Sequence, residues 1–186
     1  LAASPGAVLM SGGLARARAR ARRRFLYVAV PGIRDYLEYG GHGVLVFDID
    51  DGHRFVRRIA AGGKDASGKP INVKGIAASA TTRRLYVSTI KTLECFDLET
   101  DRLLWEKAYD GGCDRMSIAP DGSHLYVPSF EGPTWNVVSG QDGAILSVIR
   151  PDSGAHNTVY GPLGKFVYLA GLKSPLLTLA DPKTHK

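Results

Sequence analysis

The sequence predicts an all-β fold built from about four tandem copies of a four-stranded unit. The first observation is a repeated apolar motif centred on a tyrosine, and Tyr86, Tyr126 and Tyr168 lie 40 and 42 residues apart. The second is that 22 Gly and 10 Pro interrupt short apolar runs along the 186 residues, with no helical period between them. Four strands that recur every ~40 residues are typical of a β-propeller blade.

The strands of the unit follow one another in a fixed order. A run of small apolar residues forms the first strand, expected at 75–79, 116–119 and 158–161. A turn such as Pro120–Ser123 then leads into the tyrosine strand. The third strand ends on a carboxylate, which we expect to cap a turn by accepting backbone N–H groups, at Asp48, Asp97 and Asp181. A fourth strand closes the unit, at 55–59, 103–107 and 145–149.

Counting these strands indicates an incomplete propeller. Blades are expected at about 25–63, 73–110, 113–152 and 155–186, with three, four, four and three strands. The total of fourteen corresponds to about three and a half blades, whereas closed propellers have about 4–8 complete ones. We therefore expect a fragment of a larger propeller, in which the remaining blades or a second copy complete the ring and cover the exposed strand edges.

The segment Ser117–Val127 reads SIAPDGSHLYV and resembles the YVTN-type β-propeller repeat of the lactonase and quinoprotein-like superfamily. The resemblance covers residues 25–186, although 80–83 and 161–164 depart from the Pro-Asp-Gly turn of that repeat. Such relatives include lactone hydrolases, quinoprotein-like dehydrogenases and surface proteins, so the resemblance implies the fold rather than one reaction. It also implies a periplasmic or extracellular location. No signal peptide is visible in this sequence, and a cytoplasmic location stays open.

The charge distribution argues against a nucleic-acid groove. The net charge of +6 is accounted for by six arginines within residues 1–24, so residues 25–186 are neutral overall. Residues 1–24 are interpreted as a disordered Arg-rich segment, with electrostatic binding to RNA or an anionic surface as the alternative. No apolar run is long enough for a membrane span. Two cysteines without a metal-ligand spacing predict no zinc site, and no cofactor is expected.

Polar residues occupy the same position in three successive units, 12 residues before each tyrosine: Lys74, Asp114 and His156. In the last two units the next residue is also polar, Arg115 or Asn157. Because this position begins an innermost strand, the repeat places these side chains on one rim near the propeller axis. Loops between second and third strands, and the long insertion 31–42, lie at the same rim and add four candidates: Glu131, Trp135, Tyr39 and His42. Two structural alternatives stay open: ion pairs between blades, and a hydrogen-bonded structural His156.

We expect this rim to bind a small molecule or a protein partner, with no established catalysis. The alternative is a lactone hydrolase or a quinoprotein-like oxidoreductase with its site at the channel mouth. Lys74, Arg115 and His156 would then hold anionic or carbonyl oxygens. Proton transfer would fall to Asp114 or Glu131. A third class is a scaffold in which these charges serve only assembly. No nucleophile elbow, P-loop or HExxH motif favours a specific reaction.

Overall fold

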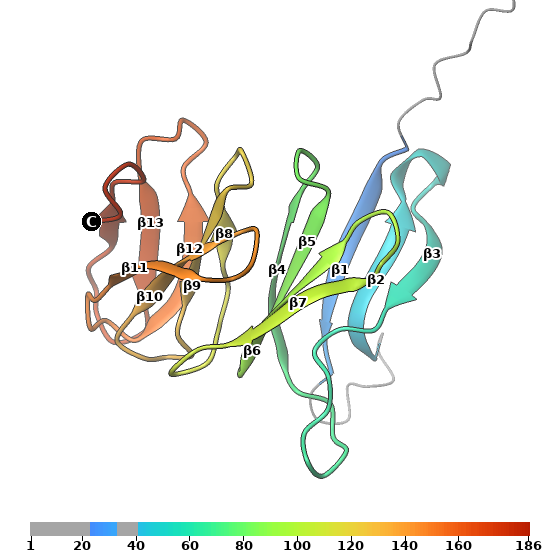
Figure 1. Cartoon of the computed structure of the whole chain (residues 1–186), viewed down its shortest axis with the longest axis horizontal. Coiled ribbons are helices and arrows are strands. Elements are labelled where there is room, and N and C mark those ends of the chain that lie inside the picture. The colour runs from blue at the N-terminus through green and yellow to red at the C-terminus, as the bar shows by residue number, and fades with distance from the viewer. Residues whose placement is uncertain (1–22, 33–40) are drawn as a thin grey trace, which may run out of the picture.

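The computed structural model describes residues 23–32 and 41–186, and these residues form an all-β fold. Fourteen strands make four antiparallel sheets that follow one another along the chain, with no α-helix in the described part. The sheets stand side by side in chain order in a propeller-like arrangement (Figure 1). Within these residues there is also no helix capable of crossing a membrane.

Each sheet is an up-and-down meander, numbered here I to IV. Sheet I contains β1 (Phe25–Pro31), β2 (His42–Asp48) and β3 (Arg54–Ile59). Sheet II contains β4 (Val73–Ser79), β5 (Arg84–Thr89), β6 (Thr92–Asp97) and β7 (Leu103–Ala108). Sheet III contains β8 (Ser117–Ile118), β9 (His124–Pro128), β10 (Trp135–Ser139) and β11 (Ile145–Ile149). Sheet IV contains β12 (Ala155–Tyr160), β13 (Val167–Gly171) and β14 (Thr178–Ala180).

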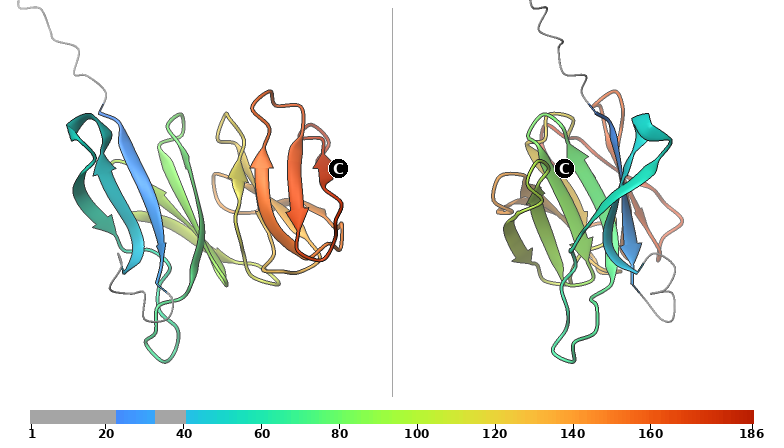
Figure 2. Two further views of the ribbon diagram at one scale, coloured as in Figure 1. Left: turned by 180° about the vertical axis from the view of Figure 1, so that it is seen from behind. Right: turned by 90° about the vertical axis from the view of Figure 1, so that its right-hand side faces the viewer.

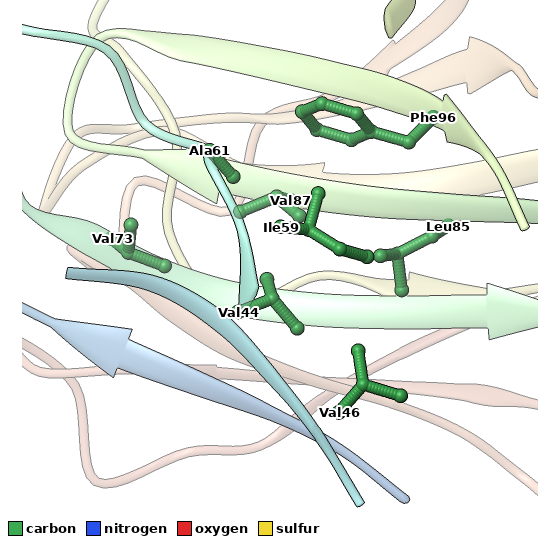
Figure 3. Packing of buried hydrophobic residues seen from close by; sticks show 8 residues of the cluster. All are labelled: Val44, Val46, Ile59, Ala61, Val73, Leu85, Val87 and Phe96. Atoms are coloured by element: carbon green, nitrogen blue, oxygen red, sulfur yellow. The ribbon is translucent and has the colours of Figure 1, made fainter. Parts of the chain in front are cut away.

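The hydrophobic core consists of three layers, one between each pair of neighbouring sheets. Figure 3 shows the first layer, where Val44, Val46 and Ile59 of sheet I meet Leu85 and Val87 of sheet II. Equivalent clusters lie between sheets II and III and between sheets III and IV. Because successive side chains of a strand point to opposite faces, the inner sheets are apolar on both faces and are covered on both.

The motif tyrosines point towards the next sheet along the chain. Tyr86 is fully buried, and its hydroxyl donates to the carbonyl of Gly140 at 2.8 Å. Tyr126 is equally buried, with its hydroxyl 2.8 Å from Nδ1 of His185. Tyr168 occupies the same place in sheet IV and is 37% exposed, because no sheet of the described chain follows it.

The carboxylates at the ends of β2 and β6 and directly after β14 cap the following turns, as the sequence predicts. The side chain of Asp48 accepts the backbone N–H of Asp50 at 3.0 Å and begins the 3₁₀ turn η2 (Ile49–Asp51). Asp97 accepts the backbone N–H of Thr100 at 2.8 Å, and Asp181 that of Lys183 at 2.7 Å.

The structure describes only the last two residues of the predicted Arg-rich segment 1–24. Residues 1–22 lie outside the described residues, and Arg23 and Arg24 directly precede β1 as exposed residues. The guanidinium of Arg23 pairs with Asp48, and that of Arg24 lies 2.6 Å from a carboxylate oxygen of Asp50. The acidic η2 turn therefore attracts the last two arginines of the run.

Candidate functional site

Two of the predicted rim residues are set apart by the same local feature, a β-bulge in an innermost strand. The register of β4 against β5 shifts between Val73 and Gly75, which leaves Lys74 unpaired. The register of β12 against β13 shifts between Ala155 and Asn157, which leaves His156 unpaired. A bulge re-aims the side chain of its extra residue. Both side chains turn towards the segment that precedes β8, where Asp114 lies.

Asp114 is the centre of the cluster, and its side chain is fully buried. Its Oδ2 lies 2.8 Å from Nδ1 of His156. Its Oδ1 lies 3.8 Å from Nζ of Lys74 and 3.9 Å from a guanidinium nitrogen of Arg115. The structure thus brings together four residues that the sequence places on the rim, from sheets II, III and IV. The predicted alternative of ion pairs between sheets describes these contacts as well.

The hydrogen-bond directions in this cluster follow from what each group can donate. A guanidinium has no acceptor, so Arg115 can only donate to Nε2 of His156, with which it is in contact. The ring proton then resides on Nδ1 and is donated to Asp114. In this arrangement both ring nitrogens of His156 are engaged by protein groups.

One atom of the cluster has no partner. Oδ1 of Asp114 is buried and accepts no hydrogen bond, since both neighbouring cations stand beyond hydrogen-bond distance. An unsatisfied buried acceptor costs about 1–3 kcal/mol, and more when charged. Nζ of Lys74 also lies 4.8 Å from the centre of the Phe130 ring, a cation–π distance. The Asp114 carboxylate therefore keeps one oxygen that no described protein group fills with a hydrogen bond.

A groove of about 250 Å³ lies beside the cluster and crosses from sheet I to sheet III. It is lined by Lys74 and Arg115 together with Ala29, Pro31, Asn72 and Val73. Oδ1 of Asn72 is a second buried acceptor without a partner. The groove therefore combines two cationic side chains, an amide acceptor and an apolar wall, a pattern common in small-ligand sites.

The close approach of sheet III to sheet II requires a glycine. A Cβ on Gly75 would lie 3.0 Å from Cα of Arg115 and 2.9 Å from Oγ of Ser88. That same hydroxyl donates to the backbone carbonyl of Asp114 at 2.7 Å. Gly75 and Ser88 together hold the peptide between Asp114 and Arg115 against β4, so the site depends on sheet packing as well as on its charged side chains.

Two other predicted residues lie near the cluster without joining it. Asn157 forms a parallel bridge with Arg115, and its side chain accepts the backbone N–H of Thr158 at 3.0 Å. Glu131 is exposed and has a positive φ of 55°, and its backbone carbonyl accepts from Nζ of Lys173 at 3.2 Å. Asn157 and Glu131 therefore contribute backbone contacts next to the cluster.

The remaining predicted residues lie elsewhere. Trp135 is fully buried between sheets III and IV, so the structure places it in the core and not on the rim. His42 packs beside Gly32 and Gly62, and its Nε2 lies 2.7 Å from the carbonyl oxygen of Ile71, which fits a structural role. Tyr39 lies outside the described residues.

Asn72 is the groove residue that sequence reasoning missed. It is the last residue of the segment 62–72, a long loop between sheets I and II that has no equivalent in the other units, so the repeat carried no signal for it. Its polarity immediately before the apolar start of β4 was the one available indication.

No family model matches the chain, and no curated protein matches it by sequence. Among solved structures, the chain is similar to the hydrazine synthase of Kuenenia stuttgartiensis, with a TM-score of 0.63 and 16% sequence identity over 78% of this chain. The chain spans 41% of that hydrazine synthase chain, less than half of its length. At this identity the similarity concerns the fold alone and supports the propeller-like arrangement of the sheets.

Proposed function

We propose that this chain is part of a β-propeller that binds a small anionic molecule, or an acidic group of a protein partner, in the groove beside Lys74 and Arg115. The observation that carries the proposal is the charge balance of the cluster. Two cations surround one buried carboxylate, and both cations line an open groove. A carboxylate or phosphate group in the groove would bring the second negative charge that this arrangement lacks.

The distances support a ligand better than a closed ion-pair network. Nζ of Lys74 is 3.8 Å from Oδ1 of Asp114, beyond hydrogen-bond distance, and Lys74 lines the groove, so its N–H donors are not used by that carboxylate. The guanidinium of Arg115 is about half exposed and offers a planar fork suited to carboxylate or phosphate oxygens. Asn72 adds a polar side chain to the wall of the groove.

A catalytic alternative draws on the pairing of Asp114 with His156, because a carboxylate that orients a histidine is a common general-base arrangement. Nε2 of His156 would have to exchange Arg115 for a substrate proton before it could act. Lactone hydrolysis by the purified chain, lost in the variant His156→Gln, would favour this alternative over simple binding.

The binding proposal is tested by isothermal titration of the chain with inorganic phosphate and with succinate at low ionic strength. We expect Arg115→Ala and Lys74→Ala each to weaken binding by roughly 5- to 150-fold, the equivalent of about 1–3 kcal/mol for a charged hydrogen bond. The matched control is Arg102→Ala, because Arg102 is exposed at the opposite end of sheet II. Equal effects of the three variants, or no binding of either anion, would contradict the proposal.

A further inference from the structure

The two ends of the row of sheets expose apolar faces that the inner sheets keep covered. Sheets I and IV stand at opposite ends of the row (Figure 2), so each has one face without a neighbouring sheet among the described residues. Directly paired residues form rows across each sheet, and equivalent rows can be compared from sheet to sheet. We call the side that faces the following sheet the forward face and the other side the backward face.

The forward face carries the motif tyrosine in sheets II, III and IV. In sheet II the row Ala77, Tyr86, Cys95 and Trp105 packs against sheet III. In sheet III, Tyr126 and its partner Val137 pack against sheet IV. The forward row of sheet IV is Val159, Tyr168 and Leu179, and here all three side chains are exposed.

The backward face is buried in sheets II and III and exposed in sheet I, at the other end of the row. In sheet II the row Leu85, Phe96 and Leu103 places its first two side chains in the core against sheet I. In sheet III, Leu125 and Val138 occupy the same positions, buried against sheet II.

The equivalent row in sheet I is Leu26, Phe47 and Phe55. Leu26 is 41% exposed and Phe55 is 51% exposed, because no described sheet precedes sheet I. Sheet IV therefore exposes a forward face and sheet I a backward face, the two kinds of face that pack together between neighbouring sheets.

We propose that a second copy of this chain occupies both faces, head to tail, with the forward face of sheet IV seated on the backward face of sheet I of the other copy. The three internal interfaces are the template, since they join the same two kinds of row. Each copy presents one forward and one backward face, so two copies make two identical contacts and leave neither face open. The eight sheets of such a pair lie within the range of closed propellers, about 4–8 blades. This inference does not depend on the proposed ligand site.

The test is sedimentation equilibrium of the chain and of two single variants, Leu179→Glu on the forward face and Phe55→Glu on the backward face. We expect a dimer for the unmodified chain, and a dissociation constant raised roughly 100-fold in either variant because a carboxylate is then buried in an apolar contact. The control is Leu104→Glu, since Leu104 on β7 is 47% exposed, close to the 49% of Leu179, and lies on neither end face. Unchanged circular dichroism spectra verify that the variants are folded.

Mixing the two face variants identifies the geometry of the contact. Each variant keeps one intact face, so Leu179→Glu and Phe55→Glu together restore one head-to-tail contact and associate with each other more tightly than with themselves. A symmetric contact between two forward faces would leave the Phe55→Glu variant dimeric. That result, a monomeric unmodified chain, or equal weakening by Leu104→Glu would each overturn the proposal.

Discussion

Replacing Trp135 by phenylalanine tests whether this residue packs the core or serves a ligand. Trp135 begins β10, is fully buried, and lies in the cluster between sheets III and IV with Val167 and Leu169. Its indole Nε1 donates to Oγ1 of Thr158 at 2.9 Å. The side chain therefore joins the two sheets by packing and by one buried hydrogen bond.

The magnitude follows from these two contributions. Full truncation to alanine would cost about 3–5 kcal/mol, a large share of the about 5–15 kcal/mol that stabilises a typical domain. Phenylalanine keeps most of the apolar volume, so the main loss is the partner of the buried Thr158 hydroxyl. Leaving that hydroxyl unsatisfied costs about 1–3 kcal/mol. We expect Trp135→Phe to lower the free energy of unfolding by this amount.

The assay is urea unfolding followed by circular dichroism, with Trp105→Phe as the matched control. Trp105 contributes to the preceding interface, where its ring centre lies 6.0 Å from that of Tyr86. Its indole nitrogen is buried without a partner, so phenylalanine removes no hydrogen bond there. Trp105→Phe should be clearly less destabilising. Equal losses in the two variants, or a loss below about 0.5 kcal/mol for Trp135→Phe, would refute this reasoning.

Two further predictions concern buried titratable groups. Burial lowers the pKa of His124 below its usual 6.5. The free energy of unfolding should therefore fall as the pH drops from about 6.5 towards that lowered pKa. Urea titrations at several pH values should show this fall, and His124→Gln should flatten it. Burial raises the pKa of Glu94, whose carboxylate accepts the backbone N–H of Gly62 at 2.8 and 3.0 Å. Glu94→Ala should lower the free energy of unfolding by about 1–3 kcal/mol. Equal melting temperatures of Glu94→Ala and Glu94→Gln would contradict the role of this hydrogen bond.

The repeated sheets were predictable because local signals agree with the packing. The tyrosine strands are apolar at successive positions, and such runs belong to strands covered on both faces. The expected fourth strands at 55–59, 103–107 and 145–149 lie within one residue of β3, β7 and β11. Turn residues were predictable as well, because an Asp side chain such as that of Asp97 accepts backbone N–H groups of the turn that follows its strand.

The candidate site was predictable in position but not in detail. Equivalent places in a repeat share a radius and a height, which is why Lys74, Asp114 and His156 meet. The bulges that turn Lys74 and His156 out of the strand ladder left no signal in the sequence. Trp135 was assigned to the rim because it follows the loop that carries Glu131, and its burial depends on a sheet formed much later in the chain.

The composition of the cluster would link the proposed ligand binding to the packing of the sheets. Lys74 comes from sheet II, Asp114 from the segment before β8, and His156 from sheet IV, so no single repeat contains the site. The carboxylate at its centre is fully buried in the packed structure. A ligand that binds the assembled cluster and not the separated sheets stabilises their packing by mass action. In a fold where each sheet contacts only its neighbours, a ligand bound at the proposed site would couple three successive sheets and so extend cooperativity beyond the nearest interface.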